Sequence, residues 1–343
     1  MIHYPSVAVV ILNWNGRKYL QQFLPSVVQS TYPALQVIVA DNASTDDSLD
    51  FLSKHYPAVQ QLRSNINEGF AKGYNTALKQ VTADYYVLLN SDVEVTPGWI
   101  EPIISLMESN ASIGACQPKV LAYHDKHSFE YAGASGGWID RFGYAFCRGR
   151  VFDNCEKDEA QYNDAAPVFW ASGCAFFIKA DVYHQLNGLD EIFFTHQEEI
   201  DLCWRMQLSG YHVYVCPSSV VYHVGGGSLP YGNPRKTFFN YRNSLMMLYK
   251  NYGVGEALWK IPFRMILDGV SVLPKLFSGE FAYIGAVLKA HLSFYGWLFS
   301  KKDKRFFPLK RAAQPQGIFK GSVVWQYFAL KKKKFAEIID NKA

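Results

Sequence analysis

Three polar turns in the first hundred residues carry side chains whose types and spacing suit ligand binding. They are NWNG at 13–16, DNAST at 41–45 and NSD at 90–92. Each follows a largely apolar run, at 7–12, 35–40 and 85–90, and such runs predict strands buried on both faces. Ligands of open α/β sheets bind outside the carboxyl ends of the strands, so we expect the three turns to share one crevice.

Asp41 and the residues after it offer carboxylate, amide and hydroxyl groups that can bond to a nucleobase edge or a ribose. The same residues suit the start of a helix over 44–55, with Ser44 or Thr45 as N-cap and acidic residues in the first turn. Both interpretations can hold at once. The agreement of the other two turns favours a binding role in addition to the cap.

NEGFAKGYN at 67–75 places Gly69 and Gly73 at the start of another predicted helix. Small residues there permit close approach of a ligand, and the free N–H groups of a helix start favour anions. The glycines equally suit tight packing of the helix on the sheet. The segment lacks the Walker pattern and the full GxGxxG spacing, which argues against a common P-loop or dinucleotide site.

Asp92, at the mouth of the predicted sheet, is a candidate metal ligand. Mg²⁺ and Mn²⁺ bind hard oxygen ligands and keep several waters, so one carboxylate together with phosphate oxygens can hold them. His223 follows an apolar run and is the candidate second ligand, and the glycines after it, 225–227, suit a loop that closes over a site. The alternatives are an ordinary turn at Asp92 and a packing role for His223.

Glu198 and Glu199 begin a predicted helix that ends near Gly210. Carboxylates are favoured at any helix start, and Asp201 with Arg205 forms an ordinary i,i+4 pair. Adjacent helical residues diverge by about 100°, so the two glutamates cannot share one role. One can act as a general base in an enclosed site, while the other binds a substrate hydroxyl or supports the loop.

The order of elements predicts an α/β fold with a mostly parallel sheet and helices on both faces. We expect one domain over 1–239 and a basic, aromatic helical extension over 240–343. Residues 111–166, with a Gly-rich aromatic stretch and an acidic loop, are expected to form an irregular insertion over the sheet. The segment after it, to residue 190, predicts a strand and a short helix.

Charge is distributed unevenly along the 343 residues. The first 239 hold 16 Lys and Arg against 24 Asp and Glu, whereas the last 104 hold 18 against 6. Scattered cysteines and the lack of a basic leader predict a cytoplasmic protein. The apolar stretch 261–299 is interrupted by charged residues, so it is expected to lie on a membrane rather than cross it.

The extension therefore predicts peripheral contact with an anionic membrane. Lys and Arg would meet the headgroups, while Trp259, Phe263, Trp297 and Phe299 would enter the boundary. The basic clusters are 301–305 and 331–334. The alternative is a solvated basic face on helices that pack on the catalytic part or on a partner. No recognised nucleic-acid motif accompanies the lysines, so a nucleic-acid partner is not expected.

Taken together, these motifs resemble glycosyltransferase family 2, which has the nucleotide-sugar-binding fold called GT-A, a Rossmann-like sheet. The resemblance covers about residues 5–245 in order. Within the family the chain is most similar to the rhamnosyltransferase-like branch of cell-surface polysaccharide biosynthesis, whose extension begins with a YRN-like segment, here 241–243. The matching segments are VVILNWNG, VIVADNASTD, NEGFAKGYN, YYVLLNSDVEV, WASGCAFFIK, GLDEIFF, EEIDLCWR and the YH before the glycines.

The resemblance implies a role for each matching residue. Asn13, Asn15, Asp41 and Asn42 would line the base and ribose site, with Asn67, Gly69 and Asn75 alongside the nucleotide. Asn90, Ser91 and Asp92 correspond to the family's DxD metal motif; Asn90 replaces its first carboxylate, so Asp92 must supply most of the protein's metal binding. His223 matches the second ligand for Mg²⁺ or Mn²⁺. Glu199 would be the base beside Glu198, and Trp170 and Gly173 would lie near the acceptor and donor sugar.

The implied activity is an inverting transfer of a sugar from a UDP- or dTDP-linked donor to a glycan or a lipid-linked acceptor. Such an enzyme would work at the inner face of the cell membrane. One alternative is a sugar nucleotidyltransferase, for which Arg17 and Lys18 would have to handle a triphosphate. Another is a non-catalytic subunit that binds a glycan or lipid.

Overall fold

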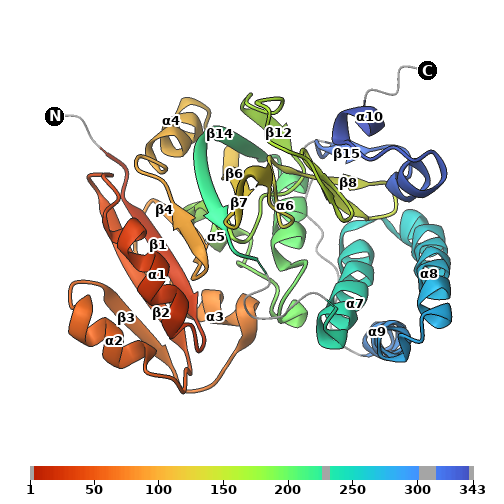
Figure 1. Ribbon diagram of the computed structural model, residues 1–343, viewed down its shortest axis with the longest axis horizontal. Helices are drawn as coiled ribbons and strands as arrows, with labels where there is room; N and C mark the ends of the chain where they lie inside the picture. The colour runs from red at the N-terminus through yellow and green to blue at the C-terminus, as the bar shows by residue number, and fades with distance from the viewer. Residues whose placement is uncertain (1–3, 226–231, 301–313, 340–343) are drawn as a thin grey trace.

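The computed structural model describes residues 4–225, 232–300 and 314–339, and its elements pack into the α/β arrangement of Figure 1. The main sheet has the strand order β12-β14-β6-β13-β4-β1-β2-β3, with β5 and β7 attached to β14 and β6. Its strands are β1 (Val7–Asn13), β2 (Leu35–Asn42), β3 (Gln60–Ser64), β4 (Tyr85–Asn90), β5 (Val93–Val95), β6 (Ile113–Ala122), β7 (Asp125–Phe129), β12 (Ala166–Val168), β13 (Ala175–Lys179) and β14 (His212–His223).

The predicted α/β class is confirmed, and the sheet is mixed. Parallel ladders join β4, β1, β2 and β3 at one end, whereas β13 runs antiparallel to both β4 and β6. The register pairs Asn13 with Asp41 and Leu12 with Asn90. The three polar turns therefore begin at the same edge of the parallel half, as their sequence positions predicted.

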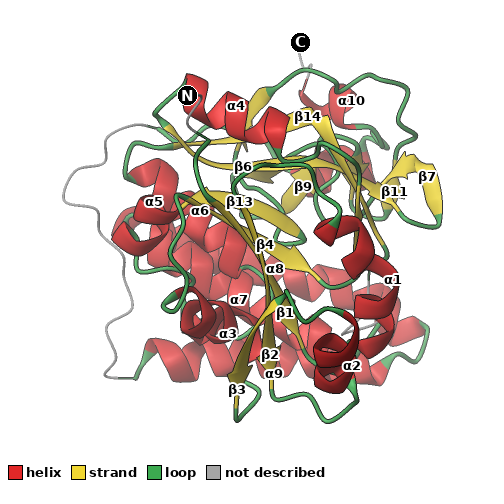
Figure 2. Ribbon diagram, turned by 90° about the vertical axis from the view of Figure 1, so that its left-hand side faces the viewer, coloured by secondary structure: helices red, strands yellow, loops and turns green. Residues whose placement is uncertain are grey.

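Helices cover both faces of the sheet because its strands are apolar on both sides. Along β1, Val7, Val9 and Ile11 belong to one buried cluster, together with residues of α1, α2 and α4, while Ala8 and Val10 belong to the other, with α3, α5 and α6. Figure 2 shows this layered arrangement. The helices are α1 (Arg17–Val28), α2 (Ser48–His55), α3 (Gly69–Leu78), α4 (Glu101–Ser109), α5 (Ala180–Gln185) and α6 (Glu198–Leu208).

The prediction of an irregular insertion over 111–166 was wrong. This region contains β6, a ten-residue central strand that pairs with β13 and β14. Its sequence hides the strand, because Gly114, Gln117, Pro118 and Lys119 interrupt the apolar pattern. Pro118 has no N–H for the ladder, and the register of β14 shifts beside it, between Cys216 and Val220.

A second, smaller sheet has the order β11-β10-β9-β8-β15 and joins the insertion to the end of the chain. β15 comes from the C-terminal region and pairs in parallel with β8. The described C-terminal residues therefore return to the part of the fold formed by residues 1–239 rather than extending away from it (Figure 1). The strands are β8 (Gly137–Asp140), β9 (Ala145–Cys147), β10 (Arg150–Val151), β11 (Asn154–Cys155) and β15 (Ile318–Phe319).

The helical extension contains α7, α8 and α9, followed by the short segments η2 and α10. The domain boundary expected between residues 239 and 240 falls inside α7, and this helix packs against α6. No helix among the described residues is both long and apolar enough to cross a bilayer. The elements are η1 (Glu191–Phe193), α7 (Pro234–Asn251), α8 (Val254–Phe277), α9 (Phe281–Leu298), η2 (Trp325–Ala329) and α10 (Phe335–Ile339).

Candidate active site

The ends of β1 and β2 form a strand-end cluster of polar side chains, Asn13, Asn15, Asp41, Asn42 and Ser44, that bond one another and the loops between them. Asn13 Nδ2 donates to Asp41 Oδ1 at 3.0 Å and to Ser44 Oγ at 3.1 Å. Asp41 Oδ2 accepts the N–H of Ser44 at 3.0 Å. Asn13 Oδ1 is buried and has no protein donor within the described residues. This oxygen lies against Gly16, where an added Cβ would be 2.4 Å from it.

Asn15 shapes the first turn and ties it to the second. Its φ is +52°, a conformation that asparagine tolerates better than most residues. Its Oδ1 accepts the N–H of Thr45 at 2.7 Å and that of Asp46 at 3.3 Å. These bonds hold the DNAST turn, and α2 begins only at Ser48 rather than at the predicted residue 44.

Asn42 extends the strand-end cluster to the NEGF turn. Its Oδ1 accepts the N–H of Glu68 at 2.9 Å, and its Nδ2 donates to Gly69 O at 3.0 Å and to Asn67 Oδ1 at 3.2 Å. The N–H of Gly69 donates to Asn67 Oδ1 at 2.9 Å. Asn42, Asn67 and Gly69 thus meet as predicted, through bonds within the protein.

The start of α3 does not present the free N–H groups expected for an anion site. Those of Phe70 and Ala71 donate to the carbonyl of Phe194, at 2.7 and 3.3 Å. A Cβ on Gly69 would lie 2.6 Å from the Phe194 ring, and φ there is +77°. Close packing of the loop before α6, rather than approach of an anion, explains this glycine.

Asn75 is not brought to the crevice. It lies two turns into α3, where its Oδ1 accepts from Tyr183 Oη at 2.6 Å and from the N–H of Leu189 at 3.0 Å. Its Nδ2 donates to Leu189 O at 2.8 Å. The amide therefore holds the turn before Asp190, and its predicted contact with a nucleotide has no free group to make it.

A depression between β2, β3 and α3 adjoins the strand-end cluster. Asp41, Asn42, Arg63 and Ser64 are among its lining residues. The analysis of the sequence missed Arg63 and Ser64, because β3 is a polar, largely exposed edge strand without an apolar run. Once β3 is known, their position at its carboxyl end, beside Asp41, indicates that they belong to the same crevice.

Asp92 and His223 come together as predicted. β5 follows the NSD turn and pairs antiparallel with the end of β14, which opposes Val93 and His223. His223 Nε2 lies 3.2 Å from Asp92 Oδ1, and both side chains are buried. Asn90 and Ser91 belong to the same turn; a Cβ on Gly16 would lie 3.4 Å from Ser91 Oγ and 2.4 Å from Asn13 Oδ1, so this turn closes on the NWNG turn.

Glu130 is a further member of this group that the sequence analysis did not identify. Its Oε2 lies 3.3 Å from His223 Nδ1, on the other side of the ring from Asp92. Burial alone would lower the pKa of His223, but the Glu130 and Asp92 carboxylates outweigh it and raise that pKa well above its usual value. Burial would raise the pKa of Asp92, and the charge of His223 lowers it. Glu130 lay in the insertion that seemed irregular.

The chemistry of this group fits a divalent cation held partly by substrate. Within the described residues, no three His, Cys, Asp or Glu side chains are arranged as a complete metal site. Asp92 and His223 would supply one oxygen and one nitrogen, leaving the other positions to phosphate oxygens and water. Glu130 would orient the ring, as carboxylates commonly do behind a metal-bound histidine. Gly226 and Gly227 of the predicted closing loop lie outside the described residues.

The α6 carboxylate pair, Glu198 and Glu199, occupies the first turn of that helix. In each residue Oε2 is buried and has no hydrogen-bond partner within the described residues. Burial raises the pKa of Glu199 to about 7. Burial, and then the charge of Glu199, raise the pKa of Glu198 well above its usual value. Burial and the repulsion between the two carboxylates thus favour retention of a proton by the pair.

One segment of chain, 172–174, connects this pair to the Asp92 group. A Cβ on Gly173 would lie 3.8 Å from Cβ and Cγ of Glu199, and Gly173 is thus next to the predicted base. The adjacent carbonyl of Cys174 accepts the N–H of Asn90 at 2.9 Å. A carboxylate able to take a proton and a potential cation site consequently flank the same short segment.

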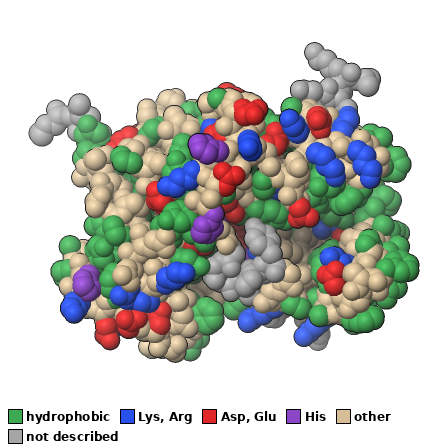
Figure 3. Space-filling view, viewed as in Figure 1, with side chains coloured by type: hydrophobic (Ala, Val, Ile, Leu, Met, Phe, Trp, Pro, Cys, Tyr) green, Lys and Arg blue, Asp and Glu red, His purple; other side chains and the backbone are tan. Residues whose placement is uncertain are grey.

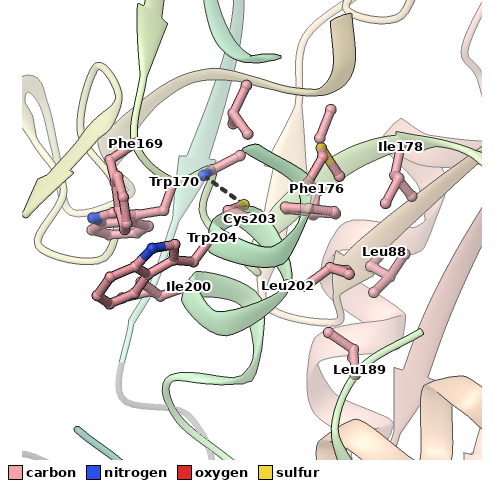
Figure 4. Close-up of a cluster of buried hydrophobic side chains, with 14 of the residues drawn as sticks. Leu88, Phe169, Trp170, Phe176, Ile178, Leu189, Ile200, Leu202, Cys203 and Trp204 are labelled. Carbon is pink, nitrogen blue, oxygen red and sulfur yellow. Dashed lines mark hydrogen bonds between the residues drawn. The ribbon is translucent and has the colours of Figure 1, made fainter. Parts of the chain in front are cut away.

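Trp170, predicted to lie near the acceptor, is part of the core. Its exposed fraction is 4%, and its Nε1 donates to Trp138 O at 3.0 Å. Figure 4 shows it among Phe169, Trp204 and Ile200 beside α6, where the N–H of Ala171 bonds to Cys203 Sγ. The side chain supports the position of α6, while Gly173 of the same segment adjoins Glu199.

Comparison with known proteins agrees with this geometry. The chain is 24% identical over 279 residues to N-acetylglucosaminyl-diphospho-decaprenol L-rhamnosyltransferase of Mycobacterium tuberculosis, covering 76% of this chain and 89% of that protein. Among solved structures, a mannosyltransferase of Pyrobaculum calidifontis, in complex with GDP-Man and Mn²⁺, has a TM-score of 0.53 at 14% identity, covering 88% and 89% of the two chains.

A second solved structure, GalNAc-T7 with UDP, GalNAc and Mn²⁺, has a TM-score of 0.55 at 15% identity; it matches 72% of this chain and 48% of that one. At these identities the two structures show a shared GT-A fold. The sequence profile of glycosyl transferase family 2 matches residues 8–184, which is more than half of the chain. The protein described here belongs to glycosyl transferase family 2.

Proposed function

We propose that this protein is an inverting glycosyltransferase that moves a sugar from a UDP- or dTDP-linked donor to a glycan or a lipid-linked sugar. The observation that carries the proposal is that two groups adjoin residues 172–174: Glu199 with Glu198 beside Gly173, and the turn of Asp92, which pairs with His223, beside Cys174. The Mycobacterium relative, named for rhamnosyl transfer to a decaprenol-linked acceptor, supports this substrate class.

In the proposed reaction the acceptor hydroxyl attacks the anomeric carbon of the donor sugar. Glu199 takes the hydroxyl proton, the new bond to the acceptor oxygen forms, and the bond from the anomeric carbon to the diphosphate oxygen breaks. The nucleoside diphosphate leaves with the electron pair, so a single displacement inverts the anomeric configuration. A divalent cation held by Asp92 and His223 would offset the charge of that leaving group.

The chain's own groups supply position and proton transfer. Burial keeps Glu199 at a pKa of about 7, where it is both ionised in part and basic enough to take a proton. Burial and the charge of Glu199 raise the pKa of Glu198, and its protonated form would donate a hydrogen bond to a sugar hydroxyl. Asp41 and Arg63 line the depression in which the base and ribose would bind.

The sugar nucleotidyltransferase alternative needs free cations in the NWNG turn. Arg17 does not provide one, because its guanidinium stacks 3.6 Å from the Phe51 ring centroid and bonds Gln21 Oε1. Asp47 also lies 3.4 Å from its Nε. Arg17 is therefore held against α1 and α2. This favours a glycosyltransferase over a sugar nucleotidyltransferase, because the guanidinium is not free to bind a triphosphate.

Calorimetric titration of UDP, dTDP and GDP, each with and without Mn²⁺, tests the proposal. We expect one diphosphate to bind only with the metal, and Asp92→Ala to abolish that binding. Asp50→Ala, an exposed aspartate on α2, is the matched control and should bind as wild type does. Failure of every diphosphate to bind would replace the proposal with a non-catalytic glycan- or lipid-binding subunit.

We also propose that the helical extension lies on an anionic membrane surface. Such contact would place the protein at the inner face of the cell membrane. Large apolar side chains are exposed on the extension, and Figure 3 shows hydrophobic side chains at its right-hand edge, below Lys and Arg side chains. Such residues suit the boundary between headgroups and acyl chains. They include Leu258, Trp259, Phe263, Ile266, Phe277, Phe281, Leu292 and Phe299 of the helices, and Trp325, Phe328 and Leu330 near η2.

The four lysines at 331–334 directly follow the exposed aromatics of η2, whereas the cluster at 301–305 lies outside the described residues. Each Lys near an anionic surface contributes about 1 kcal/mol. Trp297, predicted to enter the membrane, instead packs on Tyr249 at 5.7 Å between ring centroids.

Flotation with vesicles of phosphatidylcholine alone or mixed with phosphatidylglycerol tests the membrane contact. We expect binding only to the anionic vesicles, and at least tenfold weaker binding for Trp325→Ser combined with Phe328→Ser. Val28→Ser, an exposed apolar residue of α1, is the control. Equal flotation of the double variant and wild type would contradict the membrane contact. The basic face would then be a solvated surface or a surface that binds a protein.

A further inference from the structure

The loop before the α6 carboxylate pair has an unusual backbone. Phe194, His196 and Gln197 have φ of +63°, +68° and +75°, so three of the four residues directly before Glu198 are left-handed without being glycine. Such conformations are disfavoured for side chains with a Cβ and persist only when surrounding contacts impose them. Gln197 is the N-cap of α6, and the loop therefore sets the direction in which the glutamates leave it.

Helix α7 supplies contacts that impose this backbone. Asn243 is fully buried, and its Nδ2 lies 2.9, 2.8 and 2.8 Å from the carbonyl oxygens of Phe193, Thr195 and His196. One amide group thus serves three carbonyls of the loop. Because successive carbonyls of an extended segment point in opposite directions, only a strongly turned backbone can present all three to a single donor.

Arg242 completes the arrangement from the adjacent position. Its Nη2 donates to Ile192 O at 3.0 Å and to Phe193 O at 3.3 Å. Its Nε donates to Asn243 Oδ1 at 2.8 Å, which fixes the amide with Nδ2 toward the loop. On the opposite side, the carbonyl of Phe194 accepts the N–H groups that begin α3. The loop is consequently held from both α7 and α3.

We propose that Asn243, oriented by Arg242, is a positioning residue for the transfer reaction: it imposes the left-handed loop that places Glu199 beside Gly173. The catalytic consequence of this inference rests on the proposed function, and its structural part rests on the contacts of Asn243 and Arg242 with the loop. It assigns the 241–243 segment to the active site, although that segment lies in the region expected to form a separate extension.

The bonds from Asn243 and Arg242 to the carbonyls of 192–196, here called the clamp, differ from the other bonds that hold α7. Asn251 Nδ2 donates to Asp201 Oδ1 at 2.8 Å, and Lys250 pairs with Asp190. These contacts hold α7 to α6 and to the preceding turn without bonding the carbonyls of 193–196. Asn251→Ala is therefore a matched control, since it removes a buried asparagine on the same helix outside the clamp.

Two measurements on Asn243→Ala, Asn243→Asp and Asn251→Ala test the proposal. In steady-state kinetics we expect kcat to fall at least tenfold for both Asn243 variants, with the donor KM within about threefold of wild type. The aspartate keeps the volume of the side chain but offers no donor to the carbonyls. Asn251→Ala should lose stability and keep kcat within about threefold.

Hydrogen–deuterium exchange gives a readout that does not depend on activity. In the Asn243 variants we expect faster exchange over 193–200 and unchanged exchange over 203–208. In Asn251→Ala we expect faster exchange over 203–208 and unchanged exchange over 193–200. Unchanged exchange over 193–200 in a folded Asn243→Ala protein would overturn the clamp. A wild-type protein that transfers no sugar would overturn the proposed function alone, since exchange still decides whether Asn243 holds the loop.

Discussion

Polar side chains at the ends of β1 and β2 bond one another, whereas each carboxylate at the start of α6 has a buried oxygen with no partner among the described residues. In the strand-end cluster, Asn15 and Asn42 each serve several groups of neighbouring turns. In the α6 carboxylate pair, burial raises both pKa values. The first region is built to keep its shape before a ligand arrives, and the second stores groups whose proton affinity suits a reaction.

The largest effect we expect is on turnover, from Glu199→Gln. The amide cannot take a proton from the acceptor, so kcat should fall between about 100-fold and 10,000-fold. Diphosphate binding measured by calorimetry should stay within about threefold, because the strand-end cluster is untouched. The exposed Glu159→Gln is the control, and a variant that kept wild-type kcat would remove Glu199 from the mechanism.

A second prediction concerns the free energy of unfolding, which the raised pKa of Glu199 makes dependent on pH. Its pKa is 4.5 when unperturbed and about 7 in the fold, so between these values the folded chain binds a proton that the unfolded chain has released. Stability from this group therefore falls as pH rises through that range, by up to about 3 kcal/mol. Urea unfolding should show Glu199→Gln gaining on wild type from about pH 5 to about pH 8; a constant difference would contradict the raised pKa.

Sequence patterns identified both of these regions, but only part of the group around Asp92. β1, β2 and β4 are apolar on both faces, so the turns containing Asn13, Asp41 and Asp92 were found together. Glu130 was missed because β6 carries Pro118 and Lys119 within a central strand, which broke the expected pattern. Its position near His223 depends on the register between β6 and β14, a long-range pairing that local periodicity does not encode.

The role of Asn243 was equally invisible in the sequence. Its contacts join residues separated by 47 to 50 positions, and nothing in the YRN segment itself states that an amide will face the carbonyls before α6. Asn75 shows the opposite case, since a suitable residue type in a suitable motif is used to hold a turn. Residue types predicted the chemistry of the site. Which groups each asparagine amide bonds could be seen only in the folded structure.

Glu130→Gln should have an intermediate effect, on the metal. The neutral amide orients His223 less well, and loss of such a partner commonly lowers metal affinity between about 10-fold and 100-fold. Titration of Mn²⁺ in the presence of the diphosphate that binds should show this, with kcat at saturating Mn²⁺ largely restored. Glu94, a half-buried carboxylate on β5 that pairs with Lys126, gives the control. If the effect belongs to Glu130, Glu94→Gln should bind Mn²⁺ as wild type does.

The smallest effect we expect comes from the strand-end cluster itself, through Asn42→Ala. The change leaves the N–H of Glu68 and the carbonyl of Gly69 without their partner, which should lower the free energy of unfolding by about 1–3 kcal/mol. Because this cluster shapes turns rather than moving protons, the donor KM should rise and kcat should stay near wild type. A fall in kcat with unchanged KM would mean that the two regions are coupled through Gly69 and Phe194, whose close contact provides a direct route.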